Sequence, residues 1–108
     1  MATVNNIFLD QGTTFDFTFD LANVDGTKKD LTNYTIFAQI RRSYHSTTKV
    51  DFTTAKDNLE GEITLSLTAN QTAALKSGRY VYDVEILSNQ ETLRVLEGIL
   101  TVNPEVTR

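Results

Sequence analysis

The sequence contains no cysteine and no tryptophan, and it has a single proline among 108 residues. Without cysteine there is no disulfide framework, no thiol nucleophile and no zinc ribbon. One proline and five glycines also exclude a collagen-like repeat and a low-complexity linker. The lack of cysteine is compatible with a protein made in a reducing bacterial cytoplasm.

Basic residues are in deficit, because ten Lys and Arg stand against fourteen Asp and Glu, for a net charge of −4. A nucleic-acid-binding domain normally carries a basic stripe, whereas the adjacent basic pairs here are Lys28-Lys29 and Arg41-Arg42 alone. We interpret both pairs as solvated turn or edge charges. No nucleic acid is therefore expected as a partner.

Long apolar runs are also missing. No stretch approaches eighteen consecutive apolar residues, the length needed to cross a bilayer. Residues 1–9 lack the basic start and the long apolar run of a signal peptide. We expect no membrane association.

What the chain does contain is enough apolar material for one core. Hydrophobic residues make up 40% and charged residues 22% of the sequence, as in globular domains. A chain of this length is one domain's worth of protein, and it can bury roughly two-thirds of the surface that its unfolded form exposes. We predict a single domain over residues 1–108.

Alternation of apolar and polar residues with a period of two dominates the chain and is typical of half-buried strands. Phe15, Phe17 and Phe19 show it most clearly, with Asp16 and Asp20 on the opposite face. The predicted strands cover residues 6–9, 13–20, 34–41, 50–53, 61–67, 79–87 and 92–102. The short strand 50–53 is expected at a sheet edge, and the last strand is expected to carry a bulge near its internal glycine.

One short helix interrupts this pattern. Thr68 is a good N-cap for residues 69–75, which contain strong helix formers. Two turns make it a connector between strands. Seven strands with short turns predict an all-β fold, a seven-stranded antiparallel immunoglobulin-like β-sandwich with one short connector helix. A small barrel is the alternative architecture.

A tyrosine corner is expected where the sixth strand begins. Leu75, Gly78 and Tyr80 have the spacing found there, with the phenol ring in the core and its hydroxyl bonded to nearby backbone. The missing tryptophan and cysteine pair argue against an antibody-type domain.

The residues that could support catalysis are few and scattered. His45 is the single histidine, it lies in a polar loop, and no Gly-x-Ser-x-Gly elbow accompanies it. The acidic pairs Glu60/Glu62 and Asp83/Glu85 are interpreted as solvent-facing strand residues rather than a glycosidase pair. No run of aspartates resembles a calcium-binding loop. We therefore predict no enzymatic activity, no catalytic residue, no metal or other cofactor, and no small-molecule substrate.

Candidate contact residues lie on one strand face and at both ends of the chain. Phe37 points away from the predicted core, beside polar neighbours. The apolar run Ile7-Phe8-Leu9 and the tail 103–108, which includes Pro104, are expected to be arms that reach a neighbouring subunit.

Six short segments, in order over nearly the whole chain, carry a family resemblance. They are Gln11-Gly12-Thr13-Thr14-Phe15, Asp30-Leu31-Thr32-Asn33-Tyr34-Thr35, Gln39-Ile40-Arg41, Leu75-x-x-Gly78-x-Tyr80-x-Tyr82-Asp83-Val84-Glu85, Leu96-Glu97-Gly98 and Val102-x-Pro104-Glu105-Val106-Thr107-Arg108. They resemble a family of small β-sandwich proteins encoded among the tail genes of tailed bacteriophages, which includes collar proteins, with similar sandwiches in baseplates and fibre adaptors. Asn33 stands where the family commonly has glycine, and Phe19 stands near a common tryptophan.

The resemblance implies a structural role and carries over no catalytic residue. It implies a virion component made in the host bacterial cytoplasm, which forms a ring in the tail, collar or baseplate. The expected partners are other copies of the chain and adjacent virion proteins. The alternative function is a carbohydrate-binding or adhesin-type module that contacts the host surface.

Overall fold

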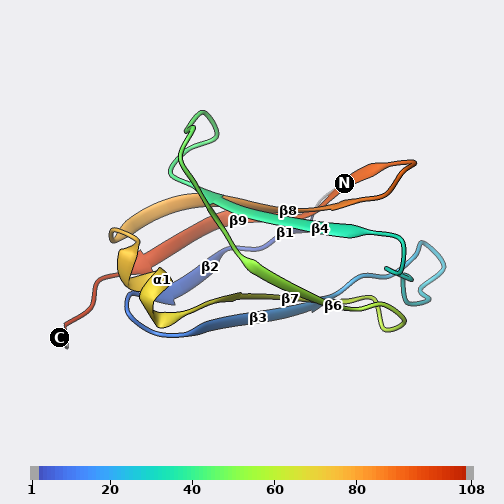
Figure 1. Cartoon of the computed structure of the whole chain (residues 1–108), viewed down its shortest axis with the longest axis horizontal. Coiled ribbons are helices and arrows are strands. Elements are labelled where there is room, and N and C mark those ends of the chain that lie inside the picture. Colours follow the sequence, from blue (N-terminus) through green and yellow to red (C-terminus); the bar gives the residue numbers. More distant parts are fainter. Residues whose placement is uncertain (1–2, 107–108) are drawn as a thin grey trace.

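The computed structural model describes residues 3–106 and folds them into two β-sheets with one short helix (Figure 1). The all-β prediction is confirmed. The elements are β1 (Thr3–Val4), β2 (Ile7–Asp10), β3 (Phe15–Asp20), β4 (Thr35–Arg41), β5 (Lys49–Asp51), β6 (Thr53–Asp57), β7 (Glu62–Leu67), α1 (Ala69–Ala74), β8 (Gly78–Leu87) and β9 (Thr92–Asn103). No helix within residues 3–106 is long and apolar enough to cross a membrane.

The larger sheet has the strand order β1-β9-β8-β4-β5, and β2 also pairs with β9. Its centre is antiparallel, but β1 and β2 run parallel to β9. The expectation of a wholly antiparallel sandwich is therefore corrected for the N-terminal segment. At this edge of the sheet, β2 and the C-terminal strand β9 run in the same direction. After β2 the chain turns and enters the other sheet (Figure 1).

The smaller sheet has the order β3-β7-β6 and is antiparallel throughout. On the central strand β7 the predicted alternation holds, because Ile63, Leu65 and Leu67 are buried while the residues between them are partly exposed. On β3 the three phenylalanines face inward but stay partly exposed. The difference arises because β3 has a neighbouring strand on one side only.

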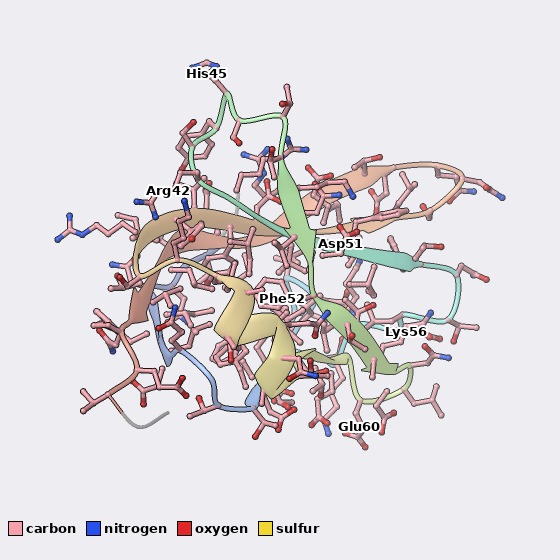
Figure 2. All side chains as sticks on the ribbon, turned by 60° about the vertical axis from the view of Figure 1, so that its left-hand side comes forward. Arg42, His45, Asp51, Phe52, Lys56 and Glu60 are labelled. Carbon is pink, nitrogen blue, oxygen red and sulfur yellow. The ribbon has the colours of Figure 1, made fainter. Side chains whose placement is uncertain are left out.

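One predicted strand proves to be two strands in different sheets. The expected edge strand 50–53 corresponds to β5 in the larger sheet and β6 in the smaller sheet, joined at Phe52. Figure 2 shows Phe52 at the point where the chain passes between the sheets. Its side chain is 5% exposed and packs near the rings of Phe15 and Tyr82. With the extra N-terminal strand β1, this raises the strand count in the described residues from the predicted seven to nine.

The core lies between the two sheets and draws on all the longer strands. Its fully buried members on β8 and β9 include Val84, Ile86 and Leu100, each 0% exposed. Leu31 is equally buried although it lies in a loop, and its amide is bonded to the Asn58 carbonyl at 3.0 Å. One apolar cluster thus spans the described residues.

The helix α1 is fixed to the connection between β2 and β3. Thr68 and Gln71 form a capping box, which satisfies amides at the helix start. Thr72 is fully buried, and its hydroxyl accepts a bond from the Gly12 amide at 3.0 Å and donates to the Thr13 carbonyl at 2.7 Å. The Gln11 amide group donates to the Leu75 carbonyl at 2.8 Å. The predicted helix is therefore present, and it ends one residue early at Ala74.

The irregularity of the last strand lies before the expected position. The register between β8 and β9 shifts between Val84 and Glu85, opposite residues 94–96, whereas Gly98 pairs regularly with Tyr82. Gly98 is required for another reason, because a Cβ placed there would lie 2.2 Å from the Asn5 carbonyl oxygen. The glycine makes room for the N-terminal segment to cross β9.

Candidate interaction surface

The side of the larger sheet that faces away from the core carries a mixed apolar and acidic surface, which we call the outer face. Its members are Phe37, Gln39 and Arg41 on β4, Val81, Asp83 and Glu85 on β8, and Arg94, Glu97 and Ile99 on β9. The register places them in cross-strand rows, Phe37 beside Glu85 and Asp83 beside Glu97. Because neighbours in such rows have Cβ atoms about 5 Å apart, they form one continuous surface.

An acidic cluster occupies the middle of the outer face. The Arg94 guanidinium lies 3.4 Å from a carboxylate oxygen of Asp83, and 3.8 Å from oxygens of Glu85 and Glu97. All four side chains are partly exposed, so each pair stabilises the fold only slightly. One cation shared by three carboxylates leaves the cluster net negative. The cluster therefore favours a partner that supplies positive charge.

Exposed apolar side chains lie beside this cluster. Phe37 is 47% exposed and Ile99 is 41% exposed, so the structure places Phe37 on the surface as the alternation indicates. Ile99 was not identified from the sequence, because its outward position depends on the pairing of β9 with β8. Its neighbours Gly98 and Leu100 are both buried, but neither is polar, so the sequence carries no alternation that distinguishes Ile99 from them.

A shallow hollow lies at the β4 end of the outer face. It has a volume of about 290 Å³, and Gln39, Arg41, Tyr44, Asp83 and Arg94 are among the residues that line it. This volume falls just below the range of about 300–1,000 Å³ for small-molecule pockets. Most of its lining side chains are polar or charged, and Val81 and the tyrosines Tyr44 and Tyr82 complete the lining. The hollow therefore adds shape to the outer face rather than a buried binding site.

The loop 42–48 carries the single histidine at an exposed position. His45 is exposed at the loop tip, above Arg42 (Figure 2). Arg41 holds the loop base by donating to the Ser46 carbonyl. Within residues 3–106 no hydrogen bond joins His45 to a hydroxyl nucleophile or to a carboxylate.

The N-terminal run does not form a free arm in this structure. Ile7 and Leu9 are 5% and 4% exposed because β2 adds to the edge of β9 and directs both side chains into the core. Their assignment as contact residues for a neighbour is corrected, since the chain's own core holds them. Phe8 points the other way and is 69% exposed.

The start of the C-terminal tail also lies against its own chain. Pro104 is exposed, while the amide of Glu105 donates to the Gln11 side chain at 3.1 Å. The last two residues of the expected arm, 107 and 108, lie outside the described residues.

The residues of the expected tyrosine corner lie together at the start of β8. Leu75 is buried, and Gly78 has a φ of +132°, which favours glycine. The Tyr80 hydroxyl donates to the Lys76 carbonyl at 2.7 Å. The Arg42 guanidinium stacks 4.8 Å from the Tyr80 ring centre.

The aspartates of the first half of the chain stabilise turns. The amide and hydroxyl of Thr27 donate to Asp25, and those of Thr32 donate to Asp30. These hydrogen bonds lower the pKa of both carboxyls.

Across residues 3–106 no group of three or more His, Cys, Asp or Glu side chains is arranged to hold a metal ion. In the acidic pair Glu60/Glu62 considered from the sequence, Glu60 is bonded to Lys28.

Tyr82 is a buried titratable group that the sequence did not single out. It is 3% exposed, its hydroxyl donates to the Asn5 carbonyl, and its burial raises the pKa from 10.0 to about 12. The hydroxyl thus holds the segment between β1 and β2 over Gly98.

Stability is expected to fall at alkaline pH because of Tyr82. Its folded-state pKa is raised, so its contribution is complete below pH 10 and is lost as the pH rises from 10 towards 12. Urea unfolding of the wild type and of Tyr82→Phe, measured across this interval, tests this. The free-energy difference between them should shrink as the pH rises, and a constant difference would contradict the assignment.

No protein-family model and no curated protein matches the chain. Among solved structures, the crystal structure of InlP from Listeria monocytogenes is similar, with a TM-score of 0.51 at 15% sequence identity. The match covers 94% of this chain and 28% of the InlP chain, so the chain corresponds to a part of that protein. At this identity the likeness concerns the fold alone.

Proposed function

We propose that the chain is an immunoglobulin-like sandwich that serves as a non-enzymatic structural component of a phage virion. In this assignment β3, β7 and β6 take the places of strands B, E and D, and β2, β9, β8, β4 and β5 those of A′, G, F, C and C′. The Tyr80–Lys76 hydrogen bond at the start of strand F supports it. The likeness to InlP over 94% of the chain indicates that this arrangement of strands also occurs in another protein.

The observation that carries the functional proposal is the outer face. It combines two half-exposed apolar side chains, Phe37 and Ile99, with an acidic cluster. An apolar and charged surface on a regular sheet suits contact with another protein. Together with the resemblance to phage tail and collar proteins, it supports a ring component of the tail, collar or baseplate that joins neighbouring virion proteins.

Electron cryo-microscopy of the intact particle is the direct test, because it gives location, copy number and neighbours together. A phage that supplies the double variant Phe37→Thr/Ile99→Thr should incorporate the protein at least about tenfold less well, since apolar anchors dominate interface energies. Threonine retains strand propensity at both positions.

Leu59→Thr is the matched control, because Leu59 is 75% exposed in the turn between β6 and β7. This variant should incorporate normally. Equal incorporation of both variants would exclude the outer face as the contact surface. Absence of the wild-type protein from particles, together with specific binding on a glycan array, would instead favour the adhesin-type function.

A further inference from the structure

The strand β3 has one unpaired edge. It pairs with β7 on one side, and within residues 3–106 no other strand pairs with it on the far side. In Figure 1 it is the blue strand along the bottom of the molecule. Its six residues alternate phenylalanine with aspartate or threonine, a composition that favours strand pairing.

The direction of the backbone groups follows from one hydrogen bond. The Leu21 amide donates to the Gly61 carbonyl at 2.7 Å, which continues the register of β3 with β7. Since hydrogen-bonded pairs alternate in an antiparallel ladder, Phe15, Phe17 and Phe19 turn their amides and carbonyls towards β7. The even-numbered residues Asp16, Thr18 and Asp20 therefore direct theirs to the free edge.

The other sheet edges are shorter or protected. β5 has three residues and β2 has four. On β6, Lys56 occupies an inward-facing position, and its ammonium donates to the carbonyls of Leu31 and Tyr34 at 2.7 Å. A charge at such a position is a common defence against edge-to-edge pairing. β3 is six residues long, and its phenylalanine side chains carry no such charge.

The inward side of β3 also remains partly open. Its three phenylalanines are partly exposed, whereas their partners Leu65 and Ile63 on β7 are 0% exposed. The rings of Phe17 and Phe19 lie 5.9 Å apart. A strand added at this edge would cover these rings and pair the free backbone groups in one step.

We propose that the occupant of this edge is β3 of a second copy of the chain, paired antiparallel about a two-fold axis at Phe17. In this register Phe17 lies opposite Phe17 of the second copy, Phe15 opposite Phe19, and Asp16 opposite Thr18. The pairing of Asp16 with Thr18 uses the free amides and carbonyls. Phe17 then forms a non-hydrogen-bonded pair, in which side chains approach most closely.

Charge selects this register over its neighbours. A slip that places Asp16 opposite Asp16, or Asp16 opposite Asp20, opposes like charges directly. A slip by a single residue would place phenylalanine opposite aspartate and turn the two apolar faces to opposite sides. The register centred on Phe17 avoids both problems, and its two-fold symmetry closes the contact at a dimer.

The dimer joins the two smaller sheets into one sheet of the order β6-β7-β3-β3-β7-β6. Its outward side carries Asp16 and Asp20 of both copies at diagonal positions, so the dimer should strengthen when salt screens these charges. A basic strand from a different protein would show the opposite dependence. The interface is small, and a dissociation constant of about 10–100 µM is expected. The dimer goes beyond the proposed virion role and is tested on the isolated protein.

Sedimentation equilibrium of three variants tests the pairing. In Thr18→Asp, a carboxylate faces Asp16 of the second copy, and dimerisation should weaken at least about tenfold. In Asp16→Lys/Thr18→Asp, lysine faces aspartate on both sides of the axis, and dimerisation should return at least to the wild-type level. The control is Thr64→Asp on the neighbouring strand β7. It removes the same hydrogen bond of 3.0 Å between the hydroxyls of Thr18 and Thr64. This variant should dimerise within about threefold of the wild type.

Two results would overturn the proposal. One is a wild type that remains monomeric at about 200 µM in about 300 mM salt. The other is a natively folded double variant, verified by circular dichroism, that fails to dimerise better than Thr18→Asp. Neither bears on virion incorporation through Phe37 and Ile99, because those residues belong to the other sheet.

Discussion

Replacing Phe52 with alanine is expected to lower the free energy of unfolding by about 4 kcal/mol. Its side chain is 5% exposed, and its ring centre lies 6.1 Å from that of Phe15 and 6.3 Å from that of Tyr82. It therefore contacts one aromatic ring from each sheet. Truncation opens a cavity where the chain crosses between the sheets, and neither side can collapse without moving a strand.

Urea unfolding followed by circular dichroism measures this loss, with Phe37→Ala as the matched control. Phe37 is 47% exposed, so its truncation should cost less than about 1 kcal/mol. Phe52→Leu should fall between the two, because leucine fills part of the volume. A loss below about 1 kcal/mol for Phe52→Ala would show that Phe52 does not join the two sheets.

The importance of Phe52 could not be predicted from the alternation around it. The inward parity runs unbroken through Val50, Phe52, Thr54 and Lys56, while the strand leaves one sheet for the other. Both sheets share the same interior, so a strand that changes sheets keeps its inner side. Thr54 and Lys56 are polar, which removed the apolar signal and ended the predicted strand too early.

Alternation predicts the faces of strands but not their partners. In the predicted strands 61–67 and 79–87 every second residue is apolar, and Ile63, Leu65 and Val84 among them are fully buried. Alternation did not separate Phe8 from Ile7 and Leu9, because all three residues are apolar. It could not indicate that β2 pairs parallel with β9, because this contact links residues about ninety positions apart and depends on the path of the whole chain.

The candidate surface was predictable to a similar extent. The exposure of Phe37 follows from its position between Ile36 and Ala38 in one strand. The cluster around Arg94 does not follow, because its carboxylates come from two strands and a register shift decides which residues meet. Local pattern therefore predicted single side chains, and the combination of side chains into a surface required the tertiary register.

Gly98→Ala is the second substitution with a large expected effect, a loss of about 3 kcal/mol in the free energy of unfolding. The new Cβ would lie 2.2 Å from the Asn5 carbonyl oxygen and 2.8 Å from its carbon, both backbone atoms. The Asn5 amide is bonded to the Glu97 carbonyl at 2.8 Å, and the Asn5 carbonyl accepts from Tyr82. The crossing segment therefore has to move and lose these bonds.

A double-mutant cycle with Tyr82→Phe separates this displacement from a general cost of removing glycine. If Gly98→Ala already breaks the Tyr82–Asn5 bond, then Tyr82→Phe should cost less in that background than in the wild type. Gly26→Ala is the control, since Gly26 has a φ of +89° and no neighbouring atom within 4 Å of an added Cβ. That variant should lose about 1 kcal/mol from backbone strain and remain additive with Tyr82→Phe. Full additivity for Gly98→Ala as well would mean that Asn5 keeps its place over β9, and the close approach would no longer explain the glycine.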